Sequence, residues 1–497
     1  MSKRTRTQAK LIHIQGRRAE AFRQLREGIS DQEILCAPLD IGKNVHWAAF
    51  HTGDGQLLHA PFEVSTLKTG YERYVQTLDE LVAAHRPRLV ILGHEPTGVY
   101  HESWARNLLT RYADHLAERA TPRFVYQWVN SYQVKLNRTQ TTLSFNKTDL
   151  LDLGAIGDLL LRGLGFPARL PSDTDLLVRQ EVYALRATQA EQRRVGNRII
   201  GLFDQLIPGA LLNPRRLARA HPELDVPSPL ATRPLERQLV EALITLCPNP
   251  YDILALGNPG IIALFHEHGY RCGPKTADKL LAVVQRALLP PADVAPAFAA
   301  ILQREFAHYQ FLSTQRAAAL ASLETLLPHT RARHLLPIPG TSAHLLARYL
   351  TGVGNLDDVL FAGQIWKKAG MTPTLYSSGD VVIYGQMSKQ GDPFFRDTLY
   401  LLGYQLALHC PYFGDAFLNA IERGKSETEA TIHAAHKVNR VFFHLLQHDE
   451  PFDPPDIPDY PAFARHGEAR MQRYLAQKKQ SRQRKTATRR RPRKQPH

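Results

Sequence analysis

The 497-residue chain has few cysteines and little that would suit it to an oxidising or a membrane environment. Its four cysteines are scattered, no pair has zinc-site spacing, and they form no disulfide framework. No apolar run approaches the roughly 18 residues of a membrane span, and the basic first residues lack the apolar core of a signal peptide. These absences argue against a zinc finger, a secreted disulfide scaffold and a membrane protein. They favour a reducing, cytoplasmic setting.

Acidic residues are scarce at both ends of the chain, which has a net charge of +15. Lys478 to His497 contains ten Lys or Arg and no acid, and Met1 to Ser30 contains eight Lys or Arg and two Glu. The body between them is therefore close to neutral. Basic arms of this kind contact nucleic-acid phosphates without reading sequence, although a merely solubilising tail has the same composition.

The first third of the chain alternates β-prone and helical segments, which predicts a mixed sheet covered by helices. A strand is expected after Glu33, and a hairpin is expected around the turn from Thr52 to Gly55. The polar segment from Asn130 to Asn146 is expected to be a connector, either lining a nucleic-acid groove or forming a plain loop. The remaining predictions in this region are a strand ending near Glu95, a strand over Phe124 to Val129, and helices over Leu67 to His85, Ser103 to Leu116 and Lys147 to Leu164.

The rest of the chain is predicted to be mainly helical. Two long amphipathic segments, Thr174 to Leu206 and Phe298 to Leu327, could form the two arms of a helical hairpin or coiled coil. Asn258-Pro259-Gly260 between them is similar to the turn of a helix-hairpin-helix. Ala464 to Gln477 is expected to form a last helix before a disordered basic tail.

Four carboxylates are candidates for a metal site. Asp40 and Glu95 end predicted strands, where α/β folds place their sites, and Asp149 and Asp152 share one helix face. Magnesium prefers such oxygen ligands, and two ions together can hold both oxygens of a phosphoryl transfer. This order of acids is that of ribonuclease-H-like nucleases and integrases. The alternative is that these acids cap local backbone or favour a positive helix end.

The stretch GMTPTLYSSGDVVIYGQMSKQGDPFFR, Gly370 to Arg396, contains the candidate nucleophile. A serine hydroxyl on a tight turn can attack a phosphate if a base or metal activates it. No base is evident, because the only carboxylates, Asp380 and Asp392, sit in turn-like contexts. Ser-Ser-Gly is also an ordinary turn sequence. Lys389 and Arg396 are candidate phosphate contacts, or else a solvated surface pair.

An ordered set of motifs makes the chain similar to transposases of the insertion sequence 110 family. LDIGKNVHWAAF, HEPTGVY and NKTDLLD resemble the N-terminal blocks of that family. LPIPGTSAHLLARYL, FAGQIWKKAGMTPTLYSSG and MSKQGDPFFRDTLY resemble its C-terminal block. The similarity covers roughly residues 34–152 and 333–451, whereas the central segment of about 208–291 and the basic ends depart from the family.

The resemblance implies an α/β plus mainly α fold: a RuvC-like (RNase H-like) DEDD domain, a helical middle region and a helical serine transposase domain. By motif, the acids are Asp40, Glu95, Asp149 and Asp152, binding Mg²⁺ or Mn²⁺, and the nucleophile is Ser378, with Ser377 as the register rival. The implied divisions are a basic arm at 1–30, the DEDD domain at 31–166, a helical or coiled-coil linker with an insert at 167–330, the serine domain at 331–455 and a basic tail at 456–497.

The resemblance also implies a function. Members of the family recombine donor and target DNA through a covalent serine–DNA intermediate, guided by an element-encoded structured (bridge) RNA. A homo-oligomer, dimer or tetramer, and a prokaryotic, nucleoid-associated location follow from it. Two alternatives stay open: a DEDD junction-resolving endonuclease that uses water, and a non-catalytic nucleic-acid-binding scaffold.

Overall fold

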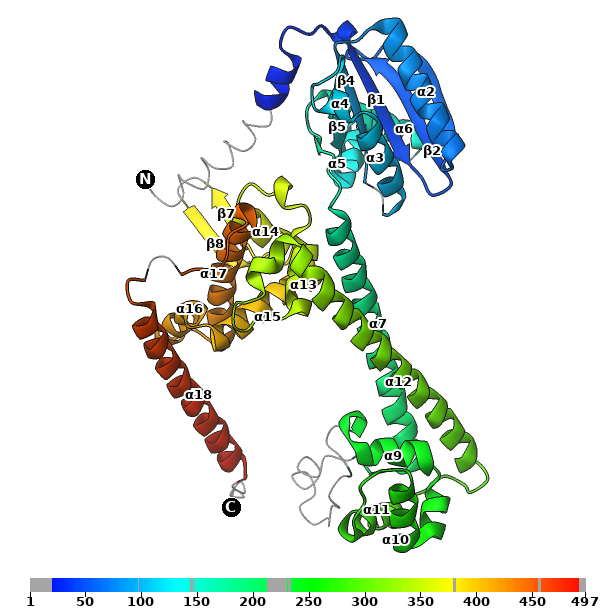
Figure 1. Cartoon of the computed structure of the whole chain (residues 1–497), viewed down its shortest axis with the longest axis vertical. Helices are drawn as coiled ribbons and strands as arrows, with labels where there is room; N and C mark the ends of the chain where they lie inside the picture. Colours follow the sequence, from blue (N-terminus) through cyan, green and yellow to red (C-terminus); the bar gives the residue numbers. More distant parts are fainter. Residues whose placement is uncertain are drawn as a thin grey trace. The chain divides into compact units, whose positions relative to one another are not determined.

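The computed structural model describes residues 20–96, 98–143, 146, 148–211, 230, 234–378, 381–454 and 457–490. Two compact units divide the chain, Met1–Pro171 and Ser172–His497. The first contains the large sheet and the second is almost entirely helical (Figure 1). The basic arm before residue 20 and the segments 212–229 and 491–497 lie outside the described residues.

The first unit is built on a mixed six-stranded sheet with the order β3-β2-β1-β4-β5-β6. β1 pairs antiparallel with β2 and parallel with β4, and β5 continues the parallel part. The predicted first strand, hairpin and later strands are all present, because each apolar run is bounded by turn residues. The strands are Ile34–Ile41 (β1), Val45–Thr52 (β2), Leu57–Ser65 (β3), Leu89–His94 (β4), Arg123–Trp128 (β5) and Phe166–Pro167 (β6).

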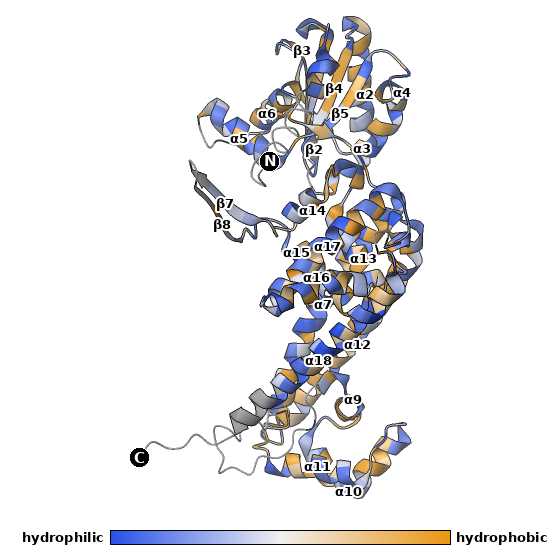
Figure 2. Ribbon diagram, turned by 90° about the vertical axis from the view of Figure 1, so that its left-hand side faces the viewer, coloured by the Kyte–Doolittle hydropathy of each residue, from blue (hydrophilic) through white to orange (hydrophobic). Residues whose placement is uncertain are grey.

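Helices cover both faces of this sheet, and the central strands β1 and β4 are correspondingly buried and mostly apolar (Figure 2). Side chains of alternate β1 residues fill two cores: Ile34 and Cys36 pack with α6, whereas Leu35 and Ala37 pack toward α2 and α3. The helices are Lys68–His85 (α2), Tyr100–Arg111 (α3), Ala113–Leu116 (α4), Ser131–Thr142 (α5) and Asp149–Leu161 (α6).

The expectation of a polar connector over 130–146 is wrong for most of its length, because α5 occupies it. The Asn130 side chain caps this helix by accepting hydrogen bonds from the backbone amides of Tyr132 and Gln133. Val134 is buried in the same core as α6. Burial of one apolar residue and contacts with α6 thus stabilise a helix whose polar composition favoured a loop.

The second unit is organised around two long packed helices, α7 (Asp173–Leu206) and α12 (Ala295–Leu326) (Figure 1). Both were predicted. Between them in sequence lie α9 (Gln238–Leu246), α10 (Pro250–Glu267) and α11 (Pro274–Arg286), which share a separate core with one end of the pair. α10 is broken at Gly257, whose φ of 61° interrupts the helix just before Asn258-Pro259. The predicted turn is therefore a kink within α10.

The other end of the pair packs into a helical bundle with its own core. The bundle helices are Ala343–Val353 (α13), Ala362–Lys368 (α14), Pro393–His409 (α15), Pro411–Glu422 (α16) and Glu427–His448 (α17). Five short 3₁₀ turns occur in the described chain, at Asp31–Glu33 (η1), Pro234–Glu236 (η2), Leu327–His329 (η3), Arg331–Leu335 (η4) and Leu356–Asp358 (η5). Among the described residues, no single helix is long and apolar enough to cross a membrane; α9 and α10 pass that test only as a pair bent by 115°.

Two features of this unit differ from expectation. The stretch around Ser378 forms a two-stranded hairpin, Pro373–Ser378 (β7) and Val381–Met387 (β8), in a region expected to be helical with a turn (Figure 2). The basic tail, expected to be disordered, continues helix α18 from Tyr460 to Arg490. Arg470 fixes this helix by ion pairs with Asp415 and Glu422 of α16.

Candidate active site

Asp40 and Glu95 lie side by side at one edge of the sheet. In the parallel register, Leu39 of β1 faces His94 of β4, so the next positions, Asp40 and Glu95, are also opposite each other. Glu95 directly follows the last residue of β4. The carboxyl ends of parallel strands thus bring two acids from distant sequence positions to one edge, as the sequence predicted.

The same face of the sheet is covered by α6, which begins with the other two acids. Strand alternation puts Asp40 on the face of Cys36, whose Sγ lies 4.0 Å from the carbonyl oxygen of Gly157 in the middle of α6. The Leu161 carbonyl at the end of α6 accepts a 3.1 Å hydrogen bond from Arg26, and Leu160 packs against Gly93 of β4. α6 therefore covers the face of the sheet on which Asp40 lies.

Asp149 and Asp152 differ sharply in environment. Asp149 is exposed, whereas the Asp152 side chain is only 9% exposed and forms an ion pair with Arg138 of α5, itself 10% exposed. Thr148 caps the helix by accepting a hydrogen bond from the Leu151 amide. Arg138 is a site residue that sequence reasoning missed, because it falls in the segment predicted to be a connector. The signal available was the cap residue Asn130 before it.

The acids fit a divalent cation by chemistry but are not closed around one. Their oxygens are the donors that Mg²⁺ or Mn²⁺ prefers. Within the described part of the chain, no group of three or more His, Cys, Asp or Glu side chains is placed to hold a metal ion. Because Asp152 is paired with Arg138, this side chain would have to exchange a partner before it could bind a cation.

His94 supports the backbone of Glu95 from the opposite face. Its Nδ1 lies 3.0 Å from the Glu95 carbonyl oxygen and its Nε2 lies 2.7 Å from the Tyr126 hydroxyl. Nδ1 must donate to the carbonyl, which leaves Nε2 to accept from the tyrosine. Complete burial lowers the pKa of His94 to about 3, so the ring is neutral. This anchor was not predicted.

Ser378 is the last residue of β7 and faces Val381, the first residue of β8. Only Gly379 and Asp380 join the strands, and both lie outside the described residues. Ser377 is one position further from the turn, opposite Val382. The backbone therefore places Ser378 beside the hairpin loop, one residue before the tight turn on which it was expected.

Arg396 and Lys389 occupy different positions at the base of this hairpin. Nη1 of Arg396 donates to the carbonyl oxygens of Ala369 (3.1 Å) and Lys389 (3.3 Å), which precede β7 and follow β8. Gly370 makes this possible: its φ is 67°, and a Cβ there would lie 2.9 Å from the same Nη1. Lys389 itself is exposed. Arg396 is thus a brace for the hairpin, and only Lys389 presents a fully exposed cation.

Other cations fix the helix that follows the hairpin. The Asp392 side chain caps α15 by accepting from the Phe394 amide. The Phe394 ring lies between the guanidinium groups of Arg186 and Arg348, at 4.5 and 4.2 Å from its centre. These contacts attach the start of α15 to α7 and α13, and they hold the segment after the hairpin in place.

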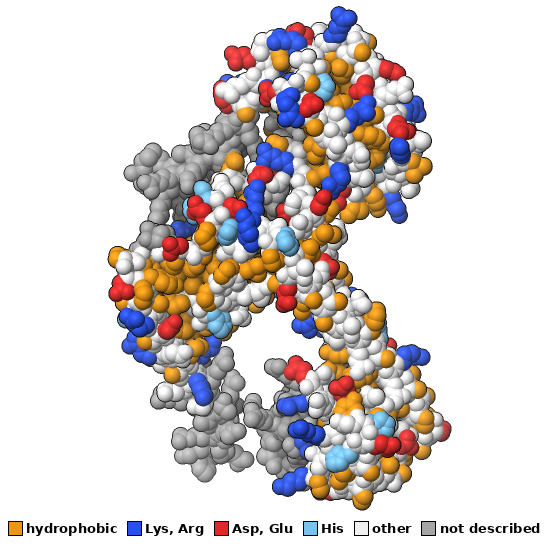
Figure 3. Space-filling view, viewed as in Figure 1, with side chains coloured by type: hydrophobic (Ala, Val, Ile, Leu, Met, Phe, Trp, Pro, Cys, Tyr) orange, Lys and Arg blue, Asp and Glu red, His pale blue; other side chains and the backbone are white. Residues whose placement is uncertain are grey.

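The structure places Asp40 beside Glu95, puts Asp149 and Asp152 on the helix that covers the same face of the sheet, and puts Ser378 in the second unit. Their meeting on one DNA strand remains a prediction. In the space-filling view, acidic and basic side chains are intermixed over the visible face of the first unit (Figure 3), which agrees with the near-neutral body of the chain.

Two comparisons with known proteins point to the same class. Residues 332–417, which contain the hairpin, match the sequence model of the transposase IS116/IS110/IS902 family. The chain is also similar to the insertion element IS110 uncharacterized 43.6 kDa protein of Streptomyces coelicolor, with 23% identity over 316 residues, or 61% of this chain and 71% of that protein. Both matches are to proteins of IS110-type insertion elements, which the motifs also resemble.

Proposed function

We propose that this protein is a DNA recombinase that moves an insertion element through a covalent serine–DNA intermediate. The main support is that the family match at 332–417 includes the hairpin with Ser378 beside its loop. The sheet order, with three parallel strands and two antiparallel ones on one side, further supports an RNase H-like first unit.

In the proposed reaction, Ser378 Oγ forms a bond to the scissile phosphorus while the bond from phosphorus to one strand oxygen breaks. The serine proton is lost, and the leaving strand end takes up a proton to become a hydroxyl. A divalent metal, held by Asp40, Glu95, Asp149 and Asp152, would polarise the phosphate. Lys389 would offset phosphate charge, and Arg396 would keep the hairpin in place. The phosphoserine conserves bond energy, so a second strand can displace it.

Donor and target DNA are the proposed substrates. A guide RNA and a dimer or tetramer are proposed as the working assembly, on the resemblance to the family. There is a physical reason to propose an oligomer. The four acids and Ser378 belong to separate units, so a partner subunit could supply either the acids or the serine to one active site.

The test of this proposal is Ser378→Ala, with Ser377→Ala as the matched control. Ser378→Ala should abolish the protein–DNA adduct seen on a denaturing gel and all strand exchange, because the proposed nucleophile is removed. Ser377→Ala should keep both. Adduct formation and strand exchange that survive in Ser378→Ala would overturn the covalent route.

A second experiment tests the role of the carboxylates. Asp149→Asn is the more informative variant because Asp149 is exposed. It should stop cleavage while nucleic-acid binding persists, and unchanged cleavage would favour the scaffold alternative. Asp152→Asn is less informative, because it also removes the buried ion pair with Arg138. Activity of Ser378→Ala combined with loss in Asp149→Asn would instead identify a water-using junction endonuclease.

A further inference from the structure

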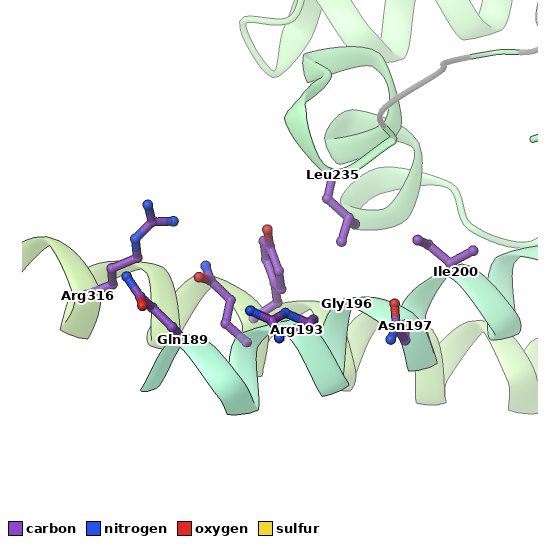
Figure 4. A pocket seen from close by; sticks show the side chains of 9 residues that line it. Gln189, Arg193, Gly196, Asn197, Ile200, Leu235 and Arg316 are labelled. Carbon is purple, nitrogen blue, oxygen red and sulfur yellow. The ribbon is translucent and has the colours of Figure 1, made fainter. Parts of the chain in front are cut away.

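A pocket of about 370 Å³ opens between α7 and α12, beside η2, and no residue of the proposed cleavage site lines it. Figure 4 shows Gln189 and Arg316 at one end and Asn197 and Ile200 at the other, with Arg193 and Gly196 between them. Its volume lies at the lower end of the roughly 300–1,000 Å³ of ligand sites. Nothing in the family resemblance assigns it a role.

Gly196 creates the floor of the pocket. This buried residue lets two side chains approach the α7 backbone, since a Cβ there would lie 3.2 Å from Leu235 and 3.5 Å from the Tyr309 ring. Tyr309 is stacked on Phe306, with ring planes 9° apart. Packing of Leu235 and Tyr309 on Gly196 therefore fixes the floor of the pocket.

The polar lining is held in place from one side. Gln192 is buried, and its Nε2 donates a 2.7 Å hydrogen bond to Ser313, whose hydroxyl donates to the Tyr309 carbonyl. Gln189 and Asn197 add two further amide groups. Amides that both donate and accept match the edges of nucleobases.

The charge of the pocket is positive. Arg193 and Arg316 line it, no Asp or Glu does, and neither arginine has a carboxylate partner within the described chain. The acids nearby are already paired, because Glu191 binds Arg194 and Arg198. Beyond the pocket, burial together with the charges of Arg348 and Arg316 lowers the pKa of His344 to about 4.

We propose that this pocket binds one unpaired nucleotide of a single-stranded nucleic-acid segment. Arg193 and Arg316 contact its flanking phosphates, and Gln189 and Asn197 contact the edge of its base. A base within a duplex would present neither a free pairing edge nor a shape that enters the pocket. The inference deepens the proposed function by giving the helical pair a contact with nucleic acid, but it depends on binding and not on cleavage.

The test uses the full chain and fluorescence anisotropy with labelled single-stranded RNA, single-stranded DNA of the same sequence, and duplex DNA, each over a salt series. Arg193→Gln and Arg316→Gln should each weaken single-strand binding about tenfold and reduce the slope of log affinity against log salt by about 0.7 per lost phosphate contact. Gln189→Ala with Asn197→Ala should weaken binding without changing that slope.

Arg194→Gln is the matched control. It removes the same charge from the same helix, but Arg194 is already paired with Glu191. It should change single-strand binding less than twofold, a small effect beside a phosphate contact. Equal losses for Arg193→Gln and Arg194→Gln, or equal losses on single-stranded and duplex probes, would overturn the proposal. A larger effect on RNA than on DNA of the same sequence would assign the nucleotide to an RNA.

Repeating the measurements in Ser378→Ala protein separates the two proposals. If the pocket binds a nucleotide, the losses should be the same in that background, whatever Ser378 does in catalysis. Failure of the pocket variants with an intact serine adduct would reject only the pocket, and the reverse result would reject only the covalent route.

Discussion

At the scale of single residues, the site depends on partners that motif reading does not supply. Glu95 follows a strand, but it is His94 behind it that fixes the backbone by hydrogen bonding to its carbonyl oxygen. Asp152 shares a helix face with Asp149, yet Asp152 is buried in an ion pair with Arg138 whereas Asp149 is exposed. A motif identifies the acid, whereas its neighbours in space set its exposure and its ion pairs.

His94 gives a prediction for pH dependence. Its folded pKa is about 3, and an unfolded histidine has a pKa near 6.5. Between these values the unfolded chain binds a proton that the folded chain does not, so the free energy of unfolding falls as pH drops, by at most about 1.4 kcal/mol per pH unit. Urea unfolding at pH 7 and pH 5 should show a smaller difference in His94→Gln than in the unmodified chain.

The control for this measurement is His85→Gln, because His85 is exposed at the end of α2. It should keep the full pH dependence. An identical pH dependence in His94→Gln and the unmodified chain would mean that His94 is not held neutral by its surroundings.

At the scale of elements, the hairpin β7–β8 is the unit that presents Ser378, and its base is more constrained than its sequence suggests. Arg396 lies on α15 and bonds to carbonyls on both sides of the hairpin. The sequence makes Arg396 a candidate phosphate contact, whereas its hydrogen bonds in the structure favour a role in positioning the hairpin. The two roles make different predictions.

If Arg396 braces the hairpin, Arg396→Gln should loosen it. Loss of two hydrogen bonds, each contributing about 1 kcal/mol, should raise amide exchange over 373–387 by up to about 30-fold, measured by hydrogen–deuterium exchange and mass spectrometry. Lys389→Gln should leave exchange unchanged while it weakens DNA cleavage. Unchanged exchange in Arg396→Gln would instead return Arg396 to the phosphate.

At the scale of the whole molecule, the described chain contains several separate cores. The sheet unit has one core on each face. The second unit has a core around α9–α11, another in the helical bundle, and a smaller one where α18 packs on α16 and α17. α7 and α12 contribute to the first two of these cores, but no residue belongs to both clusters. Such a molecule should not unfold in one step.

Calorimetry should therefore resolve more than one transition. Phe265 of α10 is 1% exposed in the α9–α11 core, and Phe265→Ala should destabilise that core by about 3–5 kcal/mol. Phe395→Ala, equally buried in the bundle, should shift a different transition. A uniform shift of all transitions by either variant would show one cooperative unit.

The sequence alone was enough for most elements whose signal is local. Alternating and continuous apolar runs predicted β1 to β5, and helical spacing predicted α2, α6, α7 and α12. The strand-end positions of Asp40 and Glu95 were also enough to predict that these two acids lie at one edge, because the carboxyl ends of parallel strands meet there. Local predictions failed where the composition favoured an irregular segment but the chain forms a helix, as in polar α5 and in the basic part of α18.

What the tertiary structure alone decided are the pairings between residues far apart in sequence. No periodicity in the sequence predicts these pairings. They are Arg138 with Asp152, Arg396 with Ala369, and Tyr309 with Gly196. The physical reason is that burial and charge pairing depend on distance in space, whereas propensity and periodicity depend on neighbours along the chain. The sequence thus determined which residues could act, and the fold determined which are exposed, paired or braced.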